Sequence, residues 1–193
     1  SQEDPTIVVS PVLHEKFIGG AGIVAAHAKG LGANVSFFSV VGDDENSHWA
    51  KEKLSEYNVN CHLYVDSSRP TTHKQRFRAS EKTLLRVSHL RSHDINIEIQ
   101  DRMLSDLEKS LLTCDLLIFS DFNYGCLPQS LVDKISKLCD ENQVMMVADS
   151  QSSSQTGNIS RFKDTNLITP TEREARIALR DYKSGLVVLA EAL

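Results

Sequence analysis

The stretch LLIFSDFNYGCLPQSLVDKISKLCDENQVMMVADS, residues 116–150, decides the fold class. Its first four residues are apolar and predict a buried strand, residues 128–142 predict a helix, and the apolar residues 144–148 predict a second buried strand. Two strands joined through a helix are typical of parallel pairing, because parallel neighbours need a long crossover connection. We therefore expect an α/β protein built on a parallel sheet.

The same alternation extends outward in both directions. Fully apolar strands of this kind are buried on both faces by helices. The sequence therefore predicts a single domain over residues 1–193, with a three-layer α/β/α architecture and a mostly parallel sheet. The further strands are expected at 35–41, 61–65 and 167–168, and the further helices at 22–31, 46–57, 95–112 and 171–179.

Two segments depart from this pattern. Residues 70–90 alternate instead, which predicts a small antiparallel ribbon, or lid, with one charged face. Residues 6–13 are β-branched but include Pro11, so we expect an edge or lid strand there, within 5–18. The charged face either binds an anionic substrate such as a sugar phosphate or protects an exposed strand, and the sequence leaves both open. The residues of one parity are Thr72, Lys74, Arg76 and Arg78.

Composition restricts the partners and the location. The chain has 193 residues, 40% apolar and 24% charged, with a formal net charge of -5. Nucleic acids and anionic membranes need a basic surface, so we expect neither as a partner, and we expect a small-molecule substrate instead. The four cysteines form no C-x-x-C pair, which indicates reduced thiols in a cytoplasmic protein.

Polar residues follow four of the predicted strands, at 42–44, 120–123, 149–150 and 169–171. In parallel sheets, ligands bind at the carboxyl ends of the strands. Each of these residues by itself also suits a turn. Their coincidence at one edge of the sheet predicts a small-molecule site that holds a cation or hydroxyl groups.

A second feature is the glycine-rich segment FIGGAGIVAAHAKGLG, residues 17–32. Gly20, Gly22 and Ala25 match the spacing of a dinucleotide-binding motif, and Asp43 follows about 20 residues later, where a ribose-binding acid would stand. That motif needs a buried strand directly before its first glycine, and the polar residues 14–16 intervene. A dinucleotide-binding oxidoreductase domain therefore remains an alternative. In the other interpretation, these small residues allow close helix packing or let a ligand approach the backbone.

Several segments together form a pattern that extends over nearly the whole chain. They are 3–9, 19–21 with 31–33, 41–44, 70–76, 85–86, 120–122 with Gly125, 147–149 and 169–174. In this order and spacing they resemble the ribokinase-like (PfkB) family of carbohydrate kinases, most closely its heptose-phosphate kinases of ADP-heptose synthesis. The resemblance implies ATP-dependent transfer of the γ-phosphoryl group to a hydroxyl of a sugar or sugar phosphate, with Mg²⁺, and a possible homodimer through the lid.

The resemblance also implies roles for individual residues. The glycine pair would lie against the sugar, because a side chain there would keep the backbone away from its hydroxyls. The lid would cover the sugar, and its cations would face a substrate phosphate. The implied substrate-binding residues are Gly19, Gly20, Lys74, Arg76, Arg86 and Asp121. The implied nucleotide-binding residues are Asp149, Thr171 and Glu174, of which Glu174 would also organise Mg²⁺.

The chain departs from the heptose-phosphate kinase pattern at Ile23, Tyr124, Gln151 and Thr171, where those kinases have Asn, Lys, Lys and Asn. A catalytically inactive, kinase-like binding or regulatory domain is therefore an alternative. The family's Gly-Ala-Gly-Asp motif, which carries the catalytic Asp, is expected beyond residue 193, and the first core strand before residue 1. We thus expect an incomplete ribokinase-like domain, in which no catalytic residue is assigned.

Overall fold

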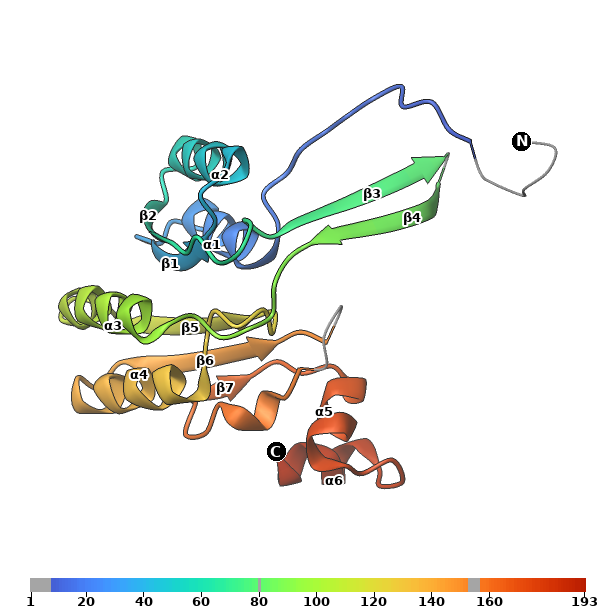
Figure 1. Ribbon diagram of the computed structural model, residues 1–193. Helices are drawn as coiled ribbons and strands as arrows, with labels where there is room; N and C mark the ends of the chain where they lie inside the picture. The colour runs from blue at the N-terminus through green and yellow to red at the C-terminus, as the bar shows by residue number, and fades with distance from the viewer. Residues whose placement is uncertain (1–7, 80, 153–156) are drawn as a thin grey trace.

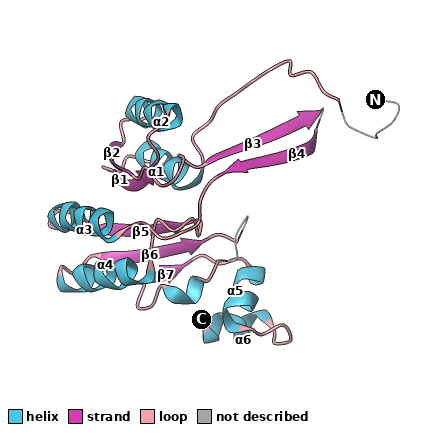
Figure 2. Cartoon of the chain, viewed as in Figure 1, coloured by secondary structure: helices cyan, strands magenta, loops and turns pink. Residues whose placement is uncertain are grey.

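The computed structural model describes residues 8–79, 81–152 and 157–193, and Figure 1 and Figure 2 show its helices and strands. Every helix and strand predicted between residues 22 and 179 is present, with ends shifted by a few residues. The helices are α1 (Gly20–Gly30), α2 (Glu45–Glu56), α3 (Ile97–Leu111), α4 (Gln129–Glu141), α5 (Glu172–Leu179) and α6 (Leu186–Ala192), with the 3₁₀ helix η1 (Ile159–Arg161). The strands are β1 (Ser36–Val41), β2 (Asn60–Val65), β3 (His73–Ala79), β4 (Lys82–His89), β5 (Leu116–Asp121), β6 (Met145–Ser150) and β7 (Leu167–Ile168).

The strands of the described residues form three sheets. β1 and β2 pair in parallel, and β5, β6 and β7 form a second parallel sheet with β6 at its centre. The β5–α4–β6 unit confirms the crossover predicted from residues 116–150, and with it the α/β class. β3 and β4 pair antiparallel and form the predicted ribbon.

The parallel strands differ from the expectation of one continuous sheet. β1 and β5 are not hydrogen-bonded to each other. Side chains of both strands nevertheless join the same core, among them Phe38 of β1 and Phe119 of β5. Apolar patterning identifies strands but not their neighbours in the sheet, so this division could not be predicted.

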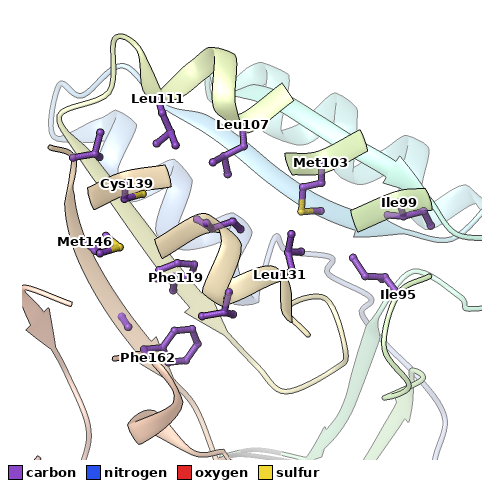
Figure 3. Packing of buried hydrophobic residues seen from close by; sticks show 14 of the residues in the cluster. Ile95, Ile99, Met103, Leu107, Leu111, Phe119, Leu131, Cys139, Met146 and Phe162 are labelled. Carbon is purple, nitrogen blue, oxygen red and sulfur yellow. The ribbon is translucent and has the colours of Figure 1, made fainter. Parts of the chain in front are cut away.

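The larger core lies between the β5–β6–β7 sheet and the helices α3 and α4 (Figure 3). The buried residues of α3 follow one another at helical spacing, so they share one face of the helix. Burial of each large apolar side chain stabilises the fold by about 1.5–3 kcal/mol. The buried residues include Ile99, Met103, Leu107, Leu111, Phe119, Leu131, Ile135, Cys139 and Met146.

The opposite face of the same sheet is less well covered. Ile118 and Met145 are exposed, and they alternate along their strands with the buried residues Phe119 and Met146. Helical cover of this sheet is therefore complete on the α3–α4 face and partial on the other. A smaller core around Ala25, Leu54 and Val59 joins α1 and α2 to the β1–β2 sheet.

Side-chain caps begin three of the described α-helices. Asp44 accepts a hydrogen bond from the amide of Ser47 at the start of α2, and Asn96 accepts one from the amide of Ile99 at the start of α3. Thr171 begins α5 with a reciprocal capping box. These caps satisfy amides that the first turn of a helix leaves without partners.

The predicted strand at 6–13 is not formed over its described part. Residues 8–19 contain no helix or strand, and residues 5–7 lie outside the described residues. Pro11 has no amide hydrogen to donate to a ladder, and Val12 is 99% exposed. The short helix α6 was not predicted. Within the described ranges, no helix is both long and apolar enough to span a membrane.

Candidate functional site

The carboxyl ends of β5, β6 and β7 bring polar side chains together, as predicted for 120–123, 149–150 and 169–171, whereas the fourth predicted segment, 42–44, follows β1 in the other parallel sheet. The Thr169 hydroxyl donates to Asp149 Oδ1 at 3.2 Å, and the Ser150 hydroxyl lies 3.5 Å from Asp121 Oδ2. The amide of Gln151 donates to the Asp121 carbonyl at 2.9 Å. One edge of this sheet therefore carries two polar pairs, of which Asp121 with Ser150 is buried.

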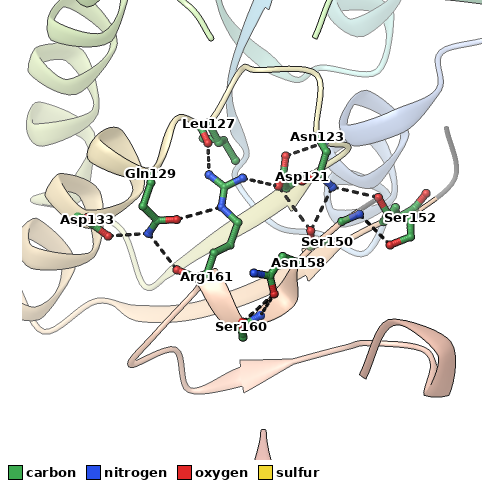
Figure 4. Close-up of polar contacts among 12 residues, drawn as sticks. Asp121, Asn123, Leu127, Gln129, Asp133, Ser150, Ser152, Asn158, Ser160 and Arg161 are labelled. Carbon is green, nitrogen blue, oxygen red and sulfur yellow. Dashed lines mark hydrogen bonds and ion pairs between the residues drawn. The ribbon is translucent and has the colours of Figure 1, made fainter. Parts of the chain in front are cut away.

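Asp121 lies at the centre of a buried network (Figure 4). It is 2% exposed, accepts from the Asn123 amide at 2.9 Å, and pairs with Arg161 Nη1 at 3.1 Å. Arg161 also donates to the Leu127 carbonyl. Burial raises the pKa of Asp121 above its usual value, although the Asn123 amide and the Arg161 charge oppose this shift. Asp121 therefore orders the loop that follows β5.

The glycine pair lies where residues 8–19 meet α1. Gly19 has an extended backbone, and a Cβ built on it meets nothing within 4 Å. Gly20 has φ +55°, and a Cβ there would lie 3.5 Å from the Phe122 ring. Gly19 is therefore open to a ligand, whereas Phe122 covers Gly20. No strand precedes Gly20 within residues 8–19, so the dinucleotide-binding alternative is wrong.

The ribbon presents its predicted cations on one face. Arg76 of β3 lies directly opposite Arg86 of β4 in the register, and both are exposed. Lys74 has the same parity as Arg76, so it lies on the same face. Neither arginine has a carboxylate partner within 4.0 Å among the described residues. Like charges directly opposite each other are destabilising, so this face has the charge of an anion-binding surface.

The charged face of the ribbon is turned toward the loop that follows β5. Lys74 Nζ lies 4.9 Å from the centroid of the Tyr124 ring, a cation–π contact. Tyr124 in turn stacks on Phe122, whose ring covers Gly20. Lys74, Tyr124, Phe122 and Gly20 thus form a continuous path from the ribbon to α1.

Glu174 and Thr171 lie together at the start of α5. Glu174 Oε2 accepts from the Thr171 amide at 2.9 Å and from its hydroxyl at 2.8 Å, and Oε1 accepts from the Ser152 amide at 2.8 Å. Partial burial raises the pKa of Glu174, but these hydrogen bonds outweigh it, so its pKa lies below the usual value. Glu174 is therefore a fixed carboxylate beside the end of β6. Across the described chain, no three His, Cys, Asp or Glu side chains group as metal ligands.

Sequence reasoning missed the charged residues that hold the loops of this site. Asp66 and Arg69 are 5% and 8% exposed and form an ion pair at 2.7 Å, and Arg161 pairs with Asp121. The spacing of Asp66 and Arg69 just before a proline was a visible signal. Their burial was not visible, because most Asp–Arg pairs at this spacing are exposed.

Solved structures with a similar fold define the class. A ribokinase from Giardia lamblia superposes with a TM-score of 0.66 at 16% identity, covering 89% of this chain and 52% of that one. A carbohydrate kinase from Agrobacterium tumefaciens gives a TM-score of 0.67 at 16% identity, covering 97% of this chain and 62% of that one. The fold is therefore that of the ribokinase-like sugar kinases.

The family follows from the sequence match. The pfkB family of carbohydrate kinases matches residues 11–187, and the chain belongs to this family. The bifunctional protein HldE of Aliarcobacter butzleri (strain RM4018) is 31% identical over 179 residues, which are 92% of this chain and 37% of that protein. The chain thus spans little more than a third of the length of this relative.

Proposed function

We propose that the protein is an ATP-dependent kinase that transfers the γ-phosphoryl group to a hydroxyl of a sugar phosphate of the heptose-phosphate type. Membership of the carbohydrate kinase family supports the reaction class. The observation that carries the proposal is the opposed pair Arg76 and Arg86, on the same face as Lys74. A phosphate dianion would relieve the repulsion between the two guanidinium groups and accept hydrogen bonds from both.

The sugar itself would lie between this face of the ribbon and the glycine pair. Gly19 is open, so its backbone can approach sugar hydroxyls, and the Phe122 and Tyr124 rings form a wall beside it. Asp121 is buried in its own network, so in this proposal it orders the loop that carries Phe122 and Tyr124 and does not contact the sugar directly. Phosphoryl transfer depends mainly on such positioning and on charge neutralisation.

The nucleotide would bind at the ends of β6 and β7. Asp149, Thr171 and Glu174 lie there, and Mg²⁺ prefers carboxylate oxygens as ligands. Both Glu174 oxygens already accept hydrogen bonds, and their remaining acceptor capacity would hold Mg²⁺ or its bound water. When bound, Mg²⁺ neutralises the charge that the ATP phosphates carry. A cytoplasmic location, where ATP is available, belongs to the same proposal.

The ribbon also supports a proposed homodimer. Phe77, Leu85 and Val87 have the parity opposite to the cations, and Leu85 is 56% exposed. An exposed apolar face on a two-stranded ribbon with free edges is a surface that a second copy would cover.

A catalytically inactive binding domain is the second candidate, because Tyr124 takes the contact with Lys74 that the ribbon would otherwise offer to a ligand. The two candidates differ in turnover. The complete gene product is incubated with Mg-ATP and a panel of heptose phosphates, hexose phosphates and the matching free sugars, and ADP formation and phosphorus NMR of the product are measured. We expect a new phosphate ester on a sugar phosphate. Binding of a sugar phosphate without ADP formation would support the inactive domain and overturn the kinase.

A further inference from the structure

The ribbon β3–β4 projects from the body of the molecule (Figure 1). Its two strands contact each other far more than they contact any other helix or strand. Its position is therefore set at its base, by segment 66–72 before β3 and segment 90–96 after β4. Both segments meet the loop that follows β5, where Tyr124 and Gly125 lie. A residue that joins all three would control where the ribbon's cations stand.

Arg69 makes that connection. Its Nε donates to Asp66 Oδ2 at 2.7 Å, its Nη1 to the Tyr124 carbonyl at 2.8 Å, and its Nη2 to the His93 carbonyl at 2.7 Å. The guanidinium fork thus spans one carboxylate and two carbonyls on three separate segments. A lysine could not do this, because its ammonium is a single point of donation.

The surroundings of this pair hold it rigidly. Asp66 also accepts from the amide and hydroxyl of Ser68, and the same hydroxyl lies 2.9 Å from His93 Nε2. These hydrogen bonds and the Arg69 charge keep the pKa of Asp66 below its usual value, although burial acts to raise it. A Cβ at Gly125 would lie 1.9 Å from the His93 carbonyl oxygen, so the two loops are in close contact.

We propose that Arg69, paired with Asp66, is a positioning residue that fixes the base of the ribbon to the loop carrying Phe122 and Tyr124. The contacts of Arg69 hold the cations of the ribbon at a fixed position relative to Gly19. The acceptor sugar phosphate can therefore contact the cations and Gly19 at the same time. This inference rests on the proposed function for its effect on catalysis. Its structural part stands independently, since it concerns the coupling of the ribbon to the loop.

The structural part is tested by amide hydrogen exchange in Arg69→Lys, which keeps the charge and the contact with Asp66 but loses the fork. The reporters are the amides of Thr71, bonded to Asp44, and of Ile95, bonded to the Gly125 carbonyl. Loss of two charge-assisted hydrogen bonds predicts exchange at least about tenfold faster at these amides. Amides within α4 are expected to keep their rates.

The matched control is Arg176→Lys. Arg176 likewise combines an ion pair, from Nε and Nη2 to Glu172, with donation from Nη1 to the carbonyls of Asp181 and Ser184, but it joins α5 to the loop before α6. We expect this variant to leave exchange at Thr71 and Ile95 unchanged. Unchanged exchange at these amides in Arg69→Lys, or equal acceleration at α4, would overturn the proposal.

The functional part is tested in the complete protein by steady-state kinetics. Arg69→Lys is expected to raise the KM for the sugar phosphate about tenfold and to leave the KM for ATP within about twofold. Equal changes in both constants would indicate a general loss of structure and overturn the positioning role. If Arg69→Lys does not fold, Ser68→Ala removes the hydroxyl that contacts both Asp66 and His93, and it is expected to shift the same amides in the same direction. If Arg69→Lys accelerates exchange but the unsubstituted protein shows no kinase activity, the structural coupling is supported and only the proposed function is overturned.

Discussion

Arg76 and Arg86 lie directly opposite each other on the ribbon, one from each strand, and within the described residues no carboxylate stands within 4.0 Å of either. Two like charges in this position reduce stability relative to a neutral pair. Such a pair is explained when a ligand supplies the opposite charge. The sugar-phosphate assignment depends on this relationship more than on any other.

Substitution of one member of the pair separates binding from stability. Arg86→Gln is expected to weaken sugar-phosphate affinity about tenfold, because a charge-assisted hydrogen bond is lost. The melting temperature is not expected to fall, because the repulsion is removed. Calorimetric titration and thermal unfolding measure the two effects. Lys82→Gln, the same charge change at the exposed tip of β4, is the control and should leave the affinity unchanged. An equal loss of affinity in this variant would mean that the overall positive charge of the ribbon, and not the Arg76–Arg86 pair, attracts the phosphate.

The two glycines are expected to respond differently to alanine. Gly20→Ala places a Cβ at φ +55°, which costs about 1–2 kcal/mol and lowers the stability measured by urea unfolding. Gly19→Ala meets no atom within 4 Å, so its stability cost is about 0.5 kcal/mol, from the weaker N-cap. Gly19→Ala should nevertheless raise the KM for the sugar about tenfold or more. A normal KM in this variant would remove Gly19 from the pocket.

Two capping residues provide a matched pair for the nucleotide side. Thr171→Ala and Asn96→Ala each remove a helix cap and should each lower the free energy of unfolding by about 1 kcal/mol. Only Thr171→Ala also releases Glu174 from its hydroxyl contact. We expect it alone to raise the KM for Mg-ATP, by roughly tenfold. The same KM change in both variants would mean that stability, and not the Glu174 site, is responsible.

Asp44 predicts a pH dependence of stability. Burial acts to raise its pKa, but hydrogen bonds from Thr71 and Ser47 outweigh it, so its pKa lies below the usual 3.8. A depressed folded-state pKa contributes stability that is present above 3.8 and is lost as the pH falls through the folded pKa. Asp44→Asn should therefore flatten the decline of unfolding free energy below about pH 4, as followed by denaturant titration at several pH values. An unchanged slope would show that the carboxylate is not perturbed.

Local sequence was sufficient for much of this fold. The apolar runs at 116–119 and 144–148 identified a parallel crossover, because strands that are apolar on both faces are typical of parallel sheets, although one face of this pair is only partly covered. The parity of Lys74 and Arg76 identified the charged face of the ribbon, because side chains alternate along a strand. These features depend on neighbours in the chain, which a single sequence contains.

What the sequence could not provide depends on long-range contacts. Arg69 bonds to His93 and Tyr124, which are 24 and 55 residues away, and its Asp-x-x-Arg spacing is equally typical of an exposed pair. Phe122 covers Gly20 only because β5 and α1 pack together. The strand expected at 6–13 is not formed in its described part, because β-branched residues form a strand only where the edge of another strand is available for pairing.

Recognition of a phosphate group on the acceptor sugar is tested most directly by a comparison of kcat/KM for a heptose phosphate and for the same heptose without its phosphate, with the complete protein and saturating Mg-ATP. Two charge-assisted hydrogen bonds to the phosphate predict a value about 100-fold or more higher for the phosphorylated sugar. Equal values for the two sugars, or a preference for the unphosphorylated one, would contradict the role assigned to Arg76 and Arg86.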